Sequence, residues 1–222
     1  MEEWIFRSTI NSDLVFYICY FNLLIIALLN QAFPKKINYM LNNLFIYINF
    51  KTSINKHFII DPFNIGSFLI ISSSLSLFFY KFFIKFIDSS FNQNDFIFIF
   101  LIISITLIFR FFLVKSIFSI FSKIDEIESY LVKNQSQNTL FCISILVLIF
   151  INEYSFINKN LIIGCFISVF LIWVTFNFLL IYRYIKNREN EFLYLIFYLC
   201  TVKISPWVWI YHSIYETRIK FL

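Results

Sequence analysis

The chain has 222 residues, of which 60% are hydrophobic and only 14% are charged, and its mean hydropathy is +0.78. A soluble domain carries about 25% charged residues, so this composition excludes an ordinary soluble globular protein. Its apolar runs are about 20 residues long, which favours membrane-spanning helices over the strands of a β-barrel, whose alternating segments have about 10 residues. The sequence therefore predicts one integral membrane domain over residues 1–222.

Six apolar runs are long enough, at 1.5 Å per helical residue, to approach the hydrocarbon thickness of about 30 Å. In chain order we expect spans over residues 14–33, 63–83, 96–115, 140–156, 161–182 and 192–214. The fourth is the weakest because Glu153 interrupts its apolar stretch, so a partial or tilted crossing stays open there. The expected fold is an all-α, polytopic transmembrane bundle of about six spans.

Two connecting segments have an amphipathic pattern. In residues 37–48, Leu41, Leu44, Phe45 and Ile48 recur at helical spacing, and residues 116–133 carry an Ile/Phe stripe opposite acidic and basic side chains. Such helices lie in the headgroup layer of a membrane. We expect two interfacial helices here, which act either as ordinary connectors or as a docking surface for a partner.

The basic residues are unequally divided between the two sides of the expected bundle. Ten Lys and Arg lie in the segments on one side and six on the other, and Arg110 and Lys203 within spans complete the total of 18. An excess of Lys and Arg marks the cytoplasmic side. This distribution predicts a multi-pass protein of the cell inner membrane with both termini outside the cytoplasm.

Chemistry-bearing residues do not gather into a recognisable motif. All four cysteines lie within apolar runs, without a CxxC pair or a Cys/His cluster, so we expect small buried hydrophobes and neither disulfides nor a metal site. The sequence also contains no nucleotide-binding loop and no nucleophile–base pair. We therefore expect no enzymatic activity, no catalytic residues and no cofactor.

Ionisable residues within the spans are costly and therefore informative. Arg110 and Lys115 lie near the cytoplasmic end of the third span, where both side chains can extend to the lipid phosphates. Lys203 lies near the middle of the last span, where its side chain is too far from the lipid phosphates to reach them.

The neighbours of Lys203 are polar as well. Thr201 and Ser205 flank it, and Pro206 breaks the backbone hydrogen bond to the carbonyl of Val202. Because irregular backbone cannot face lipid, we expect this segment to face the bundle interior. Asn22, at a similar depth in the first span, is the expected partner. The resulting polar cluster either stabilises the bundle or forms a transport site.

The segment 197–206 resembles the C-terminal signature of an integral membrane protein family of the Bacteroidota, the family of domain of unknown function 4271. In that signature Tyr-Leu-Cys-Thr is followed by an apolar residue, Glu, Ile and, two residues later, Pro. Here Lys203 occupies the position of the Glu, which implies that the function does not require a carboxylate there. The resemblance brings no established activity with it.

Two functions fit these features. The first is a non-enzymatic inner-membrane protein that acts as an accessory or scaffold subunit of a membrane complex. The alternative is a small carrier or lipid-handling protein with a midplane site at the broken last helix, although the two related halves typical of many carriers are not visible in the sequence. The expected partners are the lipid bilayer and other membrane proteins, and no nucleic acid.

Overall fold

The computed structural model describes residues 9–42, 61–87, 93–121, 124–155 and 158–186, together with Val208 and His212. These ranges form six α-helices and contain no strand: α1 (Thr9–Ala32), α2 (Pro34–Asn42), α3 (Pro62–Ile87), α4 (Gln93–Phe121), α5 (Ile124–Tyr154) and α6 (Lys159–Lys186). All except α2 are long and apolar enough to cross a membrane. The all-helical, multi-span prediction is confirmed at this level. The sixth expected span, residues 192–214, lies outside the described residues except for Val208 and His212.

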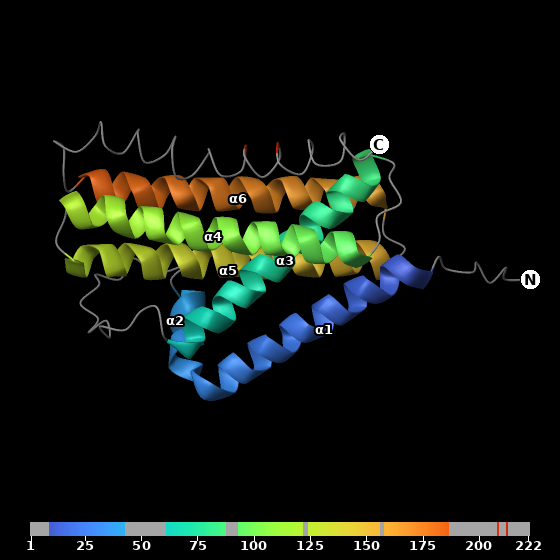
Figure 1. The fold of residues 1–222 in the computed structure, drawn as a ribbon, viewed down its shortest axis with the longest axis horizontal. Helices are drawn as coiled ribbons and strands as arrows, with labels where there is room; N and C mark the ends of the chain where they lie inside the picture. Colours follow the sequence, from blue (N-terminus) through green and yellow to red (C-terminus); the bar gives the residue numbers. More distant parts are fainter. Residues whose placement is uncertain are drawn as a thin grey trace, which may run out of the picture.

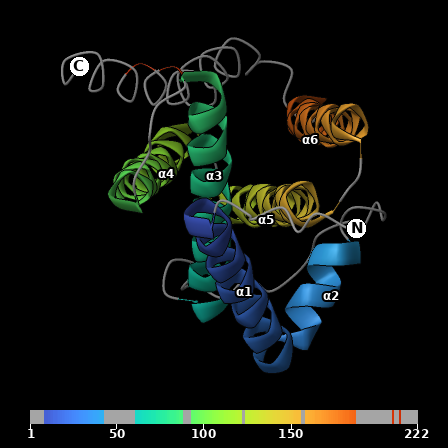
Figure 2. The ribbon, with the colours of Figure 1, turned by 90° about the vertical axis from the view of Figure 1, so that its right-hand side faces the viewer.

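Helices α4, α5 and α6 run roughly parallel to one another along the long axis, and α1 and α3 cross them obliquely (Figure 1). Helix α3 contacts α1, α4 and α5, whereas α6 packs mainly on α5 (Figure 2). One end of the bundle contains α2, the start of α3, the end of α4 and the start of α5; we call it the α2 end. Of the five long helices, α3 is the most deeply buried and α6 the least.

Helices α1 and α3 pack closely because α3 presents small side chains. The buried face of α1 repeats every three or four residues: Val15, Cys19, Asn22, Ile25 and Leu29. A Cβ atom added to Gly66 of α3 would come within 2.9 Å of the Leu29 side chain, so the backbone of α3 approaches α1 more closely than a larger residue permits. Small residues play this role in many membrane helix pairs.

The corner between α2 and α3 is fixed by capping and charge. Pro34 and Pro62 are the first residues of their helices, a position where the missing N–H has no cost. The Asp61 carboxylate accepts a hydrogen bond from the Phe63 N–H at 3.2 Å and forms a salt bridge with Lys36. The Lys36 ammonium also lies 5.0 Å from the centre of the Phe33 ring. The start of α3 is thereby tied to α2.

One expected interfacial helix is wrong as a separate element. Of residues 116–133, the described part belongs to the last turns of α4 and the first turns of α5. With 29 and 31 residues, these helices are about 43 and 46 Å long at 1.5 Å per residue. Because the hydrocarbon core is only about 30 Å thick, both helices continue beyond it without a break.

The other expected interfacial segment, residues 37–48, is described only to Asn42. Helix α2 begins at Pro34, three residues before the expected start, and buries Met40 against the bundle while Leu41 is exposed.

The fourth span begins earlier than the sequence predicted. The candidate span within α5 covers Leu131–Tyr154, whereas we expected residues 140–156. The polar residues 133–138 were interpreted as lying before the span, but Gln135 binds α3 and Asn138 binds α6. These contacts allow polar side chains to lie within the helical bundle.

Candidate functional site

Asn22 is the one member of the expected polar cluster that the structure describes. Its side chain is 0% exposed. The Oδ1 atom accepts a hydrogen bond from the Ser73 hydroxyl at 2.8 Å, and Nδ2 donates to the Ile18 carbonyl at 2.8 Å. The described partner of Asn22 is therefore a serine of α3. The remaining members, Thr201, Lys203, Ser205 and Pro206, lie outside the described residues.

A run of buried serines on α3 surrounds this contact. Ser67, Ser72, Ser73, Ser74 and Ser76 are all buried. Most of their described hydrogen bonds return to the same helix, as in the bond from the Ser76 hydroxyl to the Ser72 carbonyl at 2.5 Å. The hydroxyls of Ser72, Ser73 and Ser76 thus act as small, locally satisfied side chains, whereas the buried Ser74 hydroxyl has no partner among the described residues. We therefore interpret the serine run as a packing seam that includes one interhelical hydrogen bond.

A cavity of about 340 Å³ lies between α3, α4 and α5 near the α2 end. Its wall is mainly apolar, with aliphatic and phenylalanine side chains from all three helices. The lining residues are Asn64, Ile65, Phe68, Ile71, Leu107, Ile108, Arg110, Phe111, Phe112, Leu131, Asn134, Gln135 and Asn138. We call this cavity the α3–α4–α5 pocket. It combines an apolar wall with one cation and four amide side chains.

Arg110 is the charged group of the pocket. It follows Ile99, Ile103 and Thr106 on one face of α4 at intervals of three or four residues, and all four are buried. The sequence interpretation placed its side chain among the lipid phosphates at the membrane surface. Instead, Arg110 is only 8% exposed and lines the pocket.

Among the described residues, none forms a hydrogen bond or salt bridge with the Arg110 guanidinium. An arginine keeps its positive charge in proteins. A buried charge is expensive unless an opposite charge or hydrogen-bond acceptors compensate it. Among the described residues the pocket therefore provides no opposite charge for Arg110, which favours an anion.

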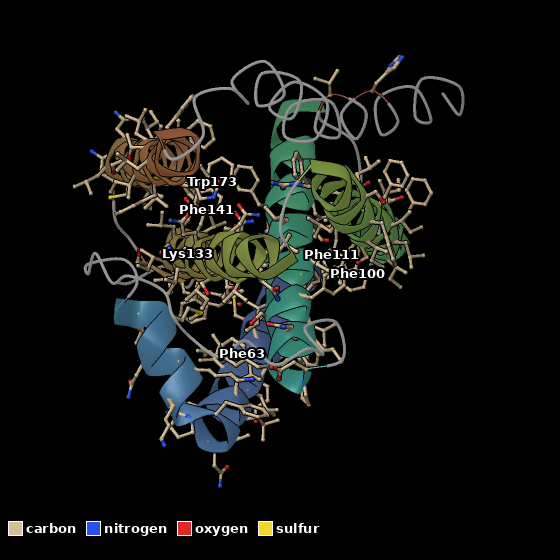
Figure 3. The ribbon with its side chains drawn as sticks, turned by 90° about the vertical axis from the view of Figure 1, so that its left-hand side faces the viewer. Phe63, Phe100, Phe111, Lys133, Phe141 and Trp173 are labelled. Atoms are coloured by element: carbon tan, nitrogen blue, oxygen red, sulfur yellow. The ribbon has the colours of Figure 1, made fainter. Side chains whose placement is uncertain are left out.

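The amides of α5 are held in place by neighbouring helices. Gln135 Nε2 donates to the Asn64 carbonyl of α3 at 3.0 Å, and Trp173 Nε1 of α6 donates to Asn138 Oδ1 at 3.1 Å. The Trp173 indole also stacks on Phe141 with 4.8 Å between ring centres, and Figure 3 shows both rings in the space between α5 and α6.

In contrast, the buried Oδ1 atom of Asn134 has no hydrogen-bond donor in the described part of the chain. The residues that line the pocket thus include Asn134, whose acceptor is unused among the described residues, as well as the Arg110 cation.

Sequence reasoning missed this pocket, although two signals were present. Thr106 and Arg110 are one helical turn apart in an otherwise apolar part of α4, and six polar residues, 133–138, come directly before the apolar part of α5. Neither signal reveals that the two segments meet near Asn64. Among the described residues, no group of three or more His, Cys, Asp or Glu side chains could hold a metal ion.

Comparison with known proteins places the chain within one family. The family described as Domain of unknown function (DUF4271) has a model that matches residues 15–214. Comparison with curated proteins and with solved structures gives no match.

Proposed function

Because the match over residues 15–214 shows that this chain belongs to the family that its C-terminal segment resembled, we propose for it a function that this family description leaves open. The protein is a non-enzymatic inner-membrane protein that handles lipid through the α3–α4–α5 pocket. The observation that carries this proposal is Arg110, a buried cation in a mainly apolar pocket. An amphiphile has the matching chemistry, since its polar headgroup and its chain need different surroundings. The resemblance also leads us to infer a Bacteroidota source.

The position of the pocket supports a lipid ligand more than a transported solute. Its lining residues lie toward the α2 end of the candidate spans of α3, α4 and α5, which suits a headgroup better than the mid-depth position where carriers bind solutes. Its volume of about 340 Å³ is at the small end of the range for ligand pockets, about 300–1,000 Å³. That volume suits a headgroup and the first carbons of its chains, with the remaining chain in the bilayer. The carrier alternative at residues 201–206 lies outside the described residues.

A substitution that fills the pocket tests the proposal. Ile108 lines the pocket and is 46% exposed, whereas Ile105 lies one turn earlier on α4, is 62% exposed and does not line it. The protein is extracted in mild detergent, and bound lipid is counted by native mass spectrometry. We expect wild type and Ile105→Trp to retain a lipid at equal stoichiometry and Ile108→Trp to lose most of it. Equal retention by all three proteins would place the bound lipid elsewhere and contradict the proposal.

The accessory or scaffold role is a second proposal, supported by α6. This helix packs mainly on α5 and exposes a broad apolar surface, which suits contact with lipid or with a partner helix. Cross-linking in native membranes before extraction, followed by mass spectrometry, tests the role. A partner recovered at fixed stoichiometry supports it, and recovery of this chain alone argues against it.

A further inference from the structure

The Arg110 guanidinium is the starting point, because its surroundings specify the sign of the ligand. It is 8% exposed and lines the pocket without a described partner. None of the described residues lining the pocket is acidic. The described part of the wall therefore offers no carboxylate that could neutralise the guanidinium, whereas a bound anion would neutralise it.

The guanidinium also specifies the kind of anion. Its five N–H donors have a planar arrangement that matches the oxygens of phosphate or carboxylate in pairs. Asn134 also lines the pocket, and its Oδ1 is buried without a donor among the described residues. A rotation of this amide toward the cavity would let it accept a hydrogen bond from a hydroxyl group on the same ligand. A phosphate that carries a glycerol meets both requirements.

The location of the pocket specifies the source of that phosphate. The α2 end carries Lys35 and Lys36, and the distribution of basic residues predicts that this end faces the cytoplasm. Anionic lipids give the cytoplasmic leaflet a negative surface that attracts such basic segments. The apolar wall around Arg110 suits the chains of a lipid better than it suits a free, hydrated ion.

We propose that the α3–α4–α5 pocket selects an anionic phospholipid of the phosphatidylglycerol type, with Arg110 binding the phosphate and Asn134 accepting a headgroup hydroxyl. This inference rests on the proposed lipid-handling function and adds its ligand class. The site differs from a passing contact with bulk lipid because the side chain lies inside the bundle, where one headgroup at a time can reach it.

The test uses the full-length protein in nanodiscs that contain equal amounts of phosphatidylglycerol and phosphatidylcholine with the same acyl chains. Native mass spectrometry measures the ratio of the two lipids that stay bound on release. Charge-assisted hydrogen bonds predict a preference for phosphatidylglycerol of about tenfold or more in the wild type. We expect Arg110→Gln to abolish this preference and Arg110→Lys, which keeps the charge but loses the paired donors, to retain part of it.

Lys35→Gln is the matched control, because it removes one positive charge from the exposed surface of the same end without altering the pocket. It should keep the wild-type preference. Equal binding of the two lipids by the wild type, or an unchanged preference in Arg110→Gln, would overturn the anionic-lipid proposal while leaving lipid handling intact. Retention of neither lipid would refute lipid handling itself. Displacement of the bound lipid by excess inorganic phosphate would identify the ligand as a free anion and also overturn the proposal.

Discussion

Removing the Ser73 hydroxyl should weaken the contact between α1 and α3. The hydroxyl donates to Asn22 Oδ1 at 2.8 Å, and its loss leaves that buried oxygen without its described donor. Interhelical hydrogen bonds within membranes contribute about 0.6 kcal/mol on average and about 1.7 kcal/mol at most. The single hydroxyl hydrogen is shared with the Leu69 carbonyl, 2.7 Å away. We therefore expect Ser73→Ala to lower the free energy of unfolding by about 1 kcal/mol.

Ser76→Ala is the matched control, because Ser76 is equally small and buried but its described hydrogen bond returns to its own helix. Its effect should stay below about 0.5 kcal/mol. Reversible unfolding in mixed micelles, followed by circular dichroism, gives both values, and a double-mutant cycle with Asn22→Ala isolates the pair. A coupling energy of about 0.5–1 kcal/mol is expected. Equal effects of the two serine substitutions, or no coupling, would mean that apolar packing alone joins the two helices.

Three further measurements test other parts of the structure. Gly66→Ala places a Cβ 2.9 Å from the Leu29 side chain and should lower the free energy of unfolding by about 1–2 kcal/mol. Gly164→Ala is the control, because no atom lies within 4 Å of the added Cβ, and it should be neutral or stabilising in the same unfolding assay. Similar effects of the two substitutions would refute the close approach of α3 to α1. The 3.1 Å salt bridge between Lys81 and Glu153 joins α3 to α5, so Glu153→Gln should lower the free energy of unfolding by about 0.5–1 kcal/mol. A double variant that exchanges the two charged residues should regain this free energy, and failure to regain it would mean that the ion pair is not what stabilises this contact. A reporter active only outside the cytoplasm should be active when fused to the C-terminus and silent between α2 and α3, and the opposite pattern would reverse the predicted orientation.

The helices could be predicted because most of them coincide with long apolar runs. The expected span from residue 63 begins one residue after the first residue of α3, and the run from residue 96 lies within α4. The start of α5 could not be predicted in this way. Gln135 and Asn138 make it polar, and only their hydrogen bonds to other helices explain how they fit into the bundle.

The functional residues were harder to place than the helices. Asn22 was expected to pair with Lys203, which lies outside the described residues. Its described partner, Ser73, is 51 positions away in the chain, and no helical periodicity connects the two. Arg110 was placed at the membrane surface because it lies near the end of an apolar run. Helix α4 is apolar around nearly its whole circumference, so its own pattern does not indicate an inward face. Packing against α3 and α5 decides that face.

The central position of α3 has a consequence for biosynthesis. Among the five long helices, α3 and α5 are the least apolar, whereas the more peripheral α4 and α6 are the most apolar. A helix enters the bilayer from the translocon more readily as its residues become more apolar, and α3 carries buried serines that are not well suited to lipid. When α3 leaves the ribosome, α4 and α5 have not yet been made. During that interval, α1 is the one long neighbouring helix that has already been made. The serines of α3 can therefore be shielded from lipid by packing against α1.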